Sequence, residues 1–170
     1  ATELATRHEG VPEDALAHTL RLPWNDVGAL HQAFEAHGPQ LAGVLINPME
    51  QTSGGAVSPI DVAFADALTE LCTSRDVLLA LDDVRHGFRL HERGSHHLMG
   101  ISPDLICLGK GLANGYSTAA LLGRESLRTA CSEIHFTATY MFSPVAYQAG
   151  QKTLEIYARD EVFSHMTLMG

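Results

Sequence analysis

Short apolar runs separated by helical patterns constrain the fold of this chain more than any other feature. The segments "LAGVLIN" (41–47), "DVLLALDD" (76–83) and "DLICLGK" (104–110) each have the length of a strand, and apolar residues fill most of each. Continuous apolar runs are typical of strands that are covered on both faces, as in parallel sheets. With helical patterns between them, they predict an α/β domain of three layers, α/β/α, with a mostly parallel sheet.

The helical patterns have recognisable ends. In the first predicted helix (25–38), Asn25 or Asp26 can act as the N-cap, apolar residues recur every three to four positions, and Gly38 ends the helix. A second helix is predicted to open at Ser58, with Pro59 in its first turn and Asp61 near its positive end. The remaining predictions are a strand at 18–23, a loop at 48–59, a strand at 117–123, a helix at 124–132 and a helix from Pro144 to about Met166.

Composition excludes several classes of function. A length of 170 residues fits one domain, and a net charge of −9 without a basic run argues against binding to nucleic acid or to an anionic membrane surface. No apolar stretch reaches the length that spans a membrane, and nothing resembles a signal peptide. Cys72, Cys107 and Cys131 are widely spaced and form no CxxC pair, which indicates free thiols in a reducing, cytoplasmic compartment.

Charged residues stand at the ends of two of the predicted strands. Asp82 and Asp83 follow one apolar run, and Lys110 follows another inside the glycine-rich "GKGLANG". In parallel sheets, ligands gather at the carboxyl ends of the strands. A partly desolvated lysine there is a usable nucleophile, although a solvated loop lysine has the same local sequence. Adjacent acids on a strand point to opposite faces, so the two should differ in role.

A carboxylate at such a strand end needs a cationic or hydrogen-bonding partner. A protonated pyridine nitrogen is one such partner, and pyridoxal phosphate carries that nitrogen together with an aldehyde that condenses with lysine. An acid at a strand end that faces a lysine therefore suits this cofactor. The alternative is a pair of acids that caps a turn completed by Gly87.

The segments "LLALDDVRHGFR", "GISPDLICLGKGLANGY" and "AALLGR" together resemble the class III aminotransferases. The closest likeness is to the branch around glutamate-1-semialdehyde aminomutase, and it extends over nearly all 170 residues. The resemblance implies the large domain of fold-type I pyridoxal-phosphate-dependent transferases, in incomplete form. One departure is Asn47-Pro48, where the family usually has Glu-Pro.

The resemblance assigns roles to individual residues. Asp82 would pair with the pyridinium nitrogen, Val84 would pack against the ring, and Lys110 would bind the aldehyde and transfer the substrate proton. Thr139 matches a threonine that binds the cofactor phosphate of the neighbouring subunit, which implies a homodimer with a shared active site. Asp83 matches the second acid of the family and is expected to support the structure.

The resemblance also implies what lies outside this sequence. Family members carry an upstream glycine-rich phosphate loop and a C-terminal small domain, and neither is present in residues 1–170. We therefore expect the chain to be the central part of the large, cofactor-binding domain. The implied activity is amino-group transfer from a small-molecule amino donor to a keto or aldehyde acceptor, with pyridoxal phosphate as the cofactor.

Several alternatives remain open at this point. The aminomutase reaction, decarboxylation and racemisation use the same residues, and a non-catalytic interaction fragment would lack a complete cofactor site. The histidines after the two acids suggest a metal-dependent hydrolase, but His91, His96 and His97 do not fall on one helical face, so no metal site is predicted. A nicotinamide dehydrogenase is weaker still, because no G-x-G-x-x-G follows a strand.

Overall fold

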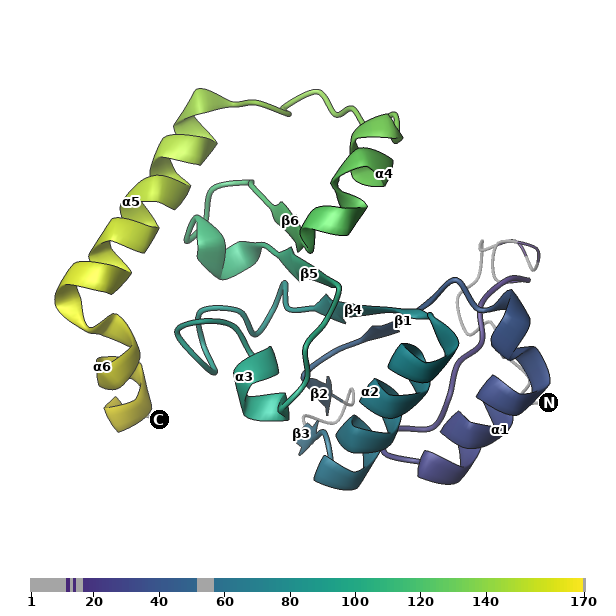
Figure 1. Ribbon diagram of the computed structural model, residues 1–170. Coiled ribbons are helices and arrows are strands. Elements are labelled where there is room, and N and C mark those ends of the chain that lie inside the picture. Colours follow the sequence, from purple (N-terminus) through teal and green to yellow (C-terminus); the bar gives the residue numbers. More distant parts are fainter. Residues whose placement is uncertain (1–11, 13, 15–16, 52–56, 170) are drawn as a thin grey trace.

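A computed structural model describes residues 12, 14, 17–51 and 57–169 of the chain (Figure 1). Its α-helices are α1 (Val27–His37), α2 (Val62–Arg75), α3 (His96–Met99), α4 (Arg128–Glu133), α5 (Pro144–Asp160) and α6 (Val162–Met169). Its strands are β1 (Gly43–Ile46), β2 (Met49–Gln51), β3 (Val57–Pro59), β4 (Leu78–Asp82), β5 (Leu105–Leu108) and β6 (Ala120–Gly123). Short 3-10 helices are η2 (Gly38–Gln40), η3 (Lys110–Leu112) and η4 (Glu125–Leu127).

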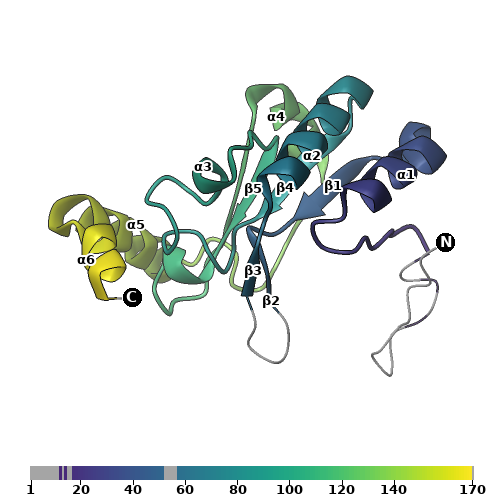
Figure 2. The same ribbon diagram turned by 90° about the horizontal axis from the view of Figure 1, so that it is seen from below.

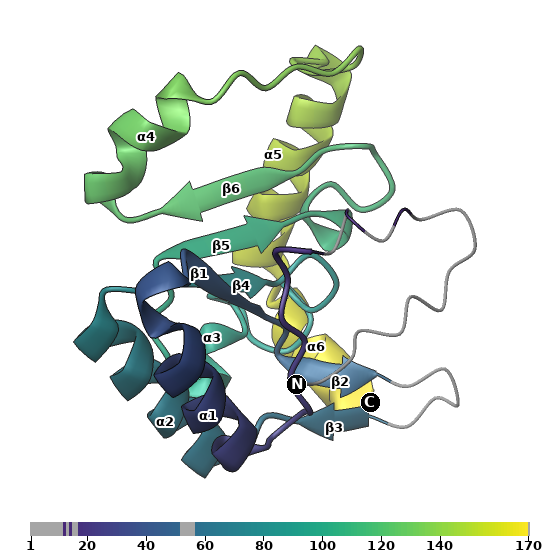
Figure 3. The same cartoon turned by 90° about the vertical axis from the view of Figure 1, so that its right-hand side faces the viewer.

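A four-stranded sheet in the order β1-β4-β5-β6 forms the centre of the fold. β1, β4 and β5 are parallel, and β6 runs antiparallel to β5. The mostly parallel sheet with flanking helices confirms the predicted α/β class. The antiparallel hairpin of β2 and β3 lies apart from this sheet (Figure 3).

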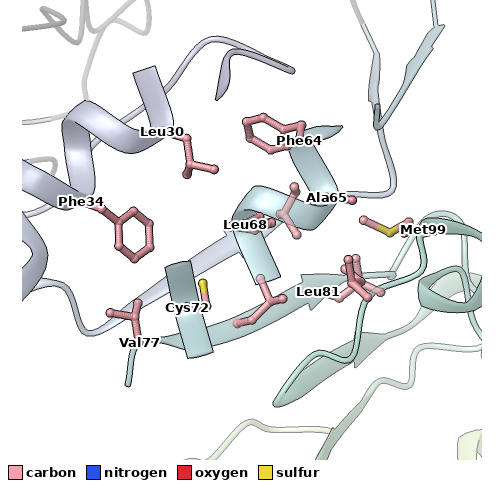
Figure 4. Close-up of a cluster of buried hydrophobic side chains, with 12 residues drawn as sticks. Leu30, Phe34, Phe64, Ala65, Leu68, Cys72, Val77, Leu81 and Met99 are labelled. Atoms are coloured by element: carbon pink, nitrogen blue, oxygen red, sulfur yellow. The ribbon is translucent and has the colours of Figure 1, made fainter. Parts of the chain in front are cut away.

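The hydrophobic core lies between the sheet and the helices α1 and α2. Leu30 and Phe34 of α1 and Leu68 of α2 are almost fully buried, and they form one cluster with Leu79 and Leu81 of β4 (Figure 4). Burying a side chain of this size contributes about 1.5–3 kcal/mol. Figures 1 and 2 both show α1 and α2 side by side along the sheet.

The prediction that the run 41–47 is covered on both faces is wrong within the described residues. Ile46 is buried in the core, but Leu45, which points to the other face of β1, is 67 % exposed. The reason is that α1 and α2 pack on one side of β1 only. Both faces of β1 carry apolar residues, but within the described residues only one of these faces is packed.

The predicted helix at 25–38 is confirmed, and its cap is resolved. The Asp26 carboxylate accepts a hydrogen bond from the Ala29 backbone N–H at 2.8 Å, so Asp26 is the N-cap of α1. Asn25 serves the next helix instead, because its Oδ1 accepts from the backbone N–H of Asp61 at 3.0 Å. Asn25 thus ties the start of α1 to the start of α2.

Two predictions near the N-terminal half are wrong in detail. The segment 18–23 is not a strand, because Leu22 packs against the core cluster instead of joining a ladder. The segment 48–59 contains the β2–β3 hairpin where a loop was predicted, and its residues 52–56 lie outside the described part of the chain. α2 begins at Val62, after the predicted start at Ser58, because Pro59 pairs with Met49 in that hairpin.

The C-terminal helical segment supports the loops at the strand ends. It divides at Glu161, whose φ of 48° ends α5 before α6 begins. The Tyr157 hydroxyl of α5 donates to the Phe88 carbonyl at 2.9 Å, and the Cβ of a side chain at Gly150 would lie 3.6 Å from the Leu112 carbonyl oxygen. In the described residues, no helix is long and apolar enough to cross a membrane.

Candidate active site at the strand ends

The structure brings the two predicted key residues to the same edge of the sheet. Asp82 is the last residue of β4, and Lys110 opens η3 two residues after the end of β5. β4 and β5 are parallel neighbours, with Asp82 opposite Cys107. Adjacent strands lie about 4.8 Å apart, so a carboxylate and an amine stand at adjoining strand ends.

Val84 connects the two strand ends. A Cβ at Gly109 would lie 3.2 Å from Val84 Cγ1, which places the valine side chain over the residue that precedes Lys110. The Val84 backbone N–H donates to Asp82 Oδ1 at 3.1 Å. Val84 therefore lies between the carboxylate-bearing end of β4 and the residue that precedes Lys110.

The backbone of Lys110 is unusual. Its φ is 45°, in the left-handed region that residues with a side chain seldom adopt. The Lys110 carbonyl accepts from Asn114 N–H at 3.1 Å, and the residue is exposed. Such conformations cost on the order of 1–3 kcal/mol and concentrate at functional sites, where the surrounding structure holds them in place.

Close backbone contacts hold the two loops together. A Cβ at Gly87 would lie 2.7 Å from the Asp83 carbonyl oxygen and 2.8 Å from Leu108 Cδ2, so only glycine fits there. A Cβ at Gly111 would approach the Gly87 carbonyl oxygen to 3.3 Å. The loop after β4 and the loop after β5 are therefore packed directly against each other.

The two adjacent acids lie in different environments, as the alternation along a strand predicted. Asp82 is half-buried at the strand end, whereas Asp83 is 0 % exposed. Asp83 accepts from the backbone N–H of Ser95 at 2.9 Å and from its hydroxyl at 2.6 Å. Ser95 could not be identified from the sequence, because it lies twelve positions from Asp83 in a loop without a regular pattern.

The histidines of this loop form a partly buried group beside Asp83. The ring centroids of His96 and His97 are 4.2 Å apart, and those of His91 and His97 are 4.9 Å apart. Burial lowers the pKa of His86 and of His96, in both cases against the attraction of the Asp83 carboxylate. Within the described part of the chain, no three His, Cys, Asp or Glu side chains are grouped as metal ligands.

Asn47 also lies at this edge. Ile46 of β1 pairs with Leu81 of β4, so Asn47 follows at the strand end next to Asp82, and it is exposed. The position of the unusual Asn47-Pro48 sequence at a strand end was visible in the sequence. Its proximity to Asp82 follows only from the strand order.

Thr139 lies apart from the other predicted site residues. It is exposed and belongs to the segment that joins α4 and α5. Figure 1 shows this segment beyond the edge strand β6, away from β4. Within this chain, the structure therefore groups three of the four predicted site residues and leaves Thr139 on the surface.

Comparison with known proteins adds a family context. The model of the family described as aminotransferase class-III matches residues 9–169. A glutamate-1-semialdehyde 2,1-aminomutase of Polynucleobacter necessarius subsp. necessarius (strain STIR1) is 36 % identical over 98 % of this chain and 39 % of its own length. A 3-aminobutyryl-CoA aminotransferase of Cloacimonas acidaminovorans (strain Evry) is 30 % identical over 95 % of this chain and 39 % of its own length.

A solved structure supports the same relationship. The internal aldimine form, with pyridoxal phosphate, of the FumI protein of Sphingopyxis sp. MTA144 has a TM-score of 0.86 and is 35 % identical. The match covers 91 % of this chain and 37 % of that protein. The chain thus spans about two fifths of the length of the proteins it matches.

Proposed function

Because the chain belongs to the class III aminotransferase family, we propose that the protein containing it catalyses pyridoxal-phosphate-dependent amino-group transfer. The substrates are a small-molecule amino donor and a keto or aldehyde acceptor. The observation that carries this proposal is the pairing of β4 with β5, which sets Asp82 and Lys110 at adjoining ends of parallel strands. A half-buried carboxylate, an exposed amine and the apolar side chain of Val84 suit an aromatic cation that carries an aldehyde.

Each of these residues has a distinct part in the proposed reaction. When bound, pyridoxal phosphate supplies an aldehyde that condenses with amines and a ring that withdraws electrons. Lys110 Nζ would hold the cofactor by its aldehyde and would carry a proton to and from the substrate carbon. The Asp82 carboxylate would accept the ring N–H and keep that nitrogen protonated, and Val84 would pack against the ring face.

The proposal extends to a homodimer with a shared site. Thr139 lies within an exposed apolar segment, in which Phe136 is 71 % and Tyr140 is 81 % exposed. Such a patch marks an interaction surface in many proteins. We propose that this segment contacts a second copy of the protein, where the Thr139 hydroxyl binds the cofactor phosphate of the neighbouring subunit.

The remaining parts of the site are proposed to lie outside residues 1–170. These residues correspond to the central part of a large, cofactor-binding domain, with a phosphate loop upstream and a small domain downstream. The three cysteines, Cys72, Cys107 and Cys131, are free, which supports a reducing, cytoplasmic compartment.

A second candidate is the aminomutase reaction, an isomerisation of an amino aldehyde. It is favoured by the identity of 36 % to a glutamate-1-semialdehyde 2,1-aminomutase. The same three residues would act in it, so the strand ends alone do not separate the two reactions. Assay of the full-length protein with a panel of amino donors and keto acids distinguishes them: transfer to a keto acid supports the aminotransferase, and isomerisation without transfer supports the aminomutase.

A direct test of the cofactor site is its absorbance. The full-length protein with added pyridoxal phosphate should show a visible band that borohydride abolishes. A protein without such a band would be a non-catalytic member of the family, and the proposed function would then be wrong.

A further inference from the structure

One buried contact closes the loop between β4 and α3. Asp83, which follows Asp82, and Ser95, which precedes α3, are both 0 % exposed. The Ser95 hydroxyl donates to Asp83 Oδ1 at 2.6 Å, and the Ser95 backbone N–H donates to Oδ2 at 2.9 Å. Both carboxylate oxygens are therefore held by a single residue twelve positions further along the chain.

The backbone of Asp83 is fixed as well. Its N–H donates to the Cys107 carbonyl of β5 at 3.0 Å, and its carbonyl accepts from Gly87 N–H at 2.8 Å. Hydrogen bonds to an ionised group are roughly twice as strong as those between neutral groups. The side chain and the backbone together hold the peptide units on both sides of Asp83 in one orientation.

This contact reaches the site through Val84. The Val84 N–H, next along the chain, donates to Asp82 Oδ1 at 3.1 Å, and the Val84 side chain lies against Gly109. A rotation of the peptide between Asp83 and Val84 would turn the Asp82 carboxylate and displace the apolar side chain beside Lys110. The orientation of both groups thus depends on the anchoring of Asp83.

We infer that Ser95 is a positioning residue of the active site, which holds Asp82 and Val84 in the orientation that binds the cofactor by anchoring the Asp83 carboxylate. This inference rests on the proposed function. Ser95 acts through Asp83 and not by contact with the reacting groups.

The test is Ser95→Ala in the full-length protein, which removes the hydroxyl and keeps the backbone N–H. A lost hydrogen bond to a charged group should raise the dissociation constant of pyridoxal phosphate roughly tenfold. In the cofactor-free protein, amide hydrogen exchange at Val84 and Gly87 should accelerate by about the same factor. Ser132→Ala is the matched control, because its hydroxyl also donates a 2.7 Å bond but lies on the exposed surface of α4. It should change neither quantity.

Ser95→Cys extends the test to a side chain of similar size. A thiol fills the same space and is a weaker donor, so an intermediate dissociation constant is expected, and this variant carries the test if Ser95→Ala does not fold. A wild-type protein that forms no visible band with the cofactor overturns the proposed function and this inference with it. If the wild type binds pyridoxal phosphate and Ser95→Ala and Ser95→Cys bind it as tightly as the wild type, only the positioning role of Ser95 is overturned. This holds even if amide hydrogen exchange accelerates in the variants.

Discussion

The strand-end loops and the segment between α4 and α5 differ in how far contacts within the described chain bury their residues. In the first, Asp83 and Ser95 are fully buried and bonded to each other, and Val84 packs on Gly109. In the second, residues 134–140 are all exposed, although several are large and apolar. One part of the proposed site is thus organised by contacts within the chain, whereas the other is exposed and is the part that we propose contacts a second copy of the protein.

The comparison is tested most severely by Lys110→Ala. Removal of the only side chain that can condense with the aldehyde in the proposed mechanism should abolish the visible band and lower turnover by at least roughly 10³-fold. Absorbance before and after borohydride, together with the amino-transfer assay, measures both effects. Lys152→Ala, which removes a surface ion pair with Glu155, is the control and should leave both unchanged. A band that survives Lys110→Ala would place the cofactor elsewhere.

The two acids provide the next test. Asp82→Asn should lower turnover by about 10²-fold or more, because an amide does not keep the ring nitrogen protonated. The fold should persist, since the Asn oxygen can still accept from Val84 N–H. Asp83→Asn replaces two hydrogen bonds to a carboxylate with bonds to a neutral amide, whose NH₂ can donate to Ser95 Oγ, and should cost about 1–2 kcal/mol of unfolding free energy. Greater loss of turnover from Asp83→Asn than from Asp82→Asn would exchange the two assigned roles.

The strand-end region was predictable from the sequence because the patterns that mark it are local. An apolar run that ends in acids, and another that ends in Gly-Lys-Gly, place Asp82 and Lys110 at the edge of a parallel sheet. The adjacency of β4 and β5 and the contact between Val84 and Gly109 depend on strand order, which the runs alone do not encode. Ser95 was not predictable, because a single serine in a loop has no periodicity and its partner lies twelve residues away.

The errors in the fold have the same origin. The Gly, Ser and Pro content of the segment 48–59 is typical of a loop, yet Met49 and Pro59 pair across a hairpin. Composition alone does not predict such a pairing. The segment 18–23 has the composition of a strand, but its Leu22 packs on the core cluster instead of pairing in the sheet. For Leu45, the apolar sequence predicted a covered face that the described residues do not cover.

The exposed segment is tested by Thr139→Ala. If the Thr139 hydroxyl binds the cofactor phosphate as we propose, its loss should raise the dissociation constant of the cofactor severalfold to about tenfold, with no change in unfolding free energy. Thr137→Ala is a matched control, because it removes the same group from an exposed position two residues away. The effect of Thr139→Ala should appear at protein concentrations at which the protein is dimeric by sedimentation. Equal binding by both variants would remove Thr139 from the site.

The smallest expected effect concerns pH and belongs to the strand-end region alone. Burial lowers the pKa of His96 below its ordinary value of 6.5, so the folded state favours the neutral ring. The unfolded chain then binds more protons just below pH 6.5, and the unfolding free energy should decrease as the pH falls from 6.5 through the lowered pKa of the folded state. His96→Gln should flatten that decrease in urea titrations between pH 7 and 5, whereas His31→Gln, on the exposed surface of α1, should leave it unchanged. An identical slope in all three proteins would show that protonation of His96 does not govern the stability of these loops.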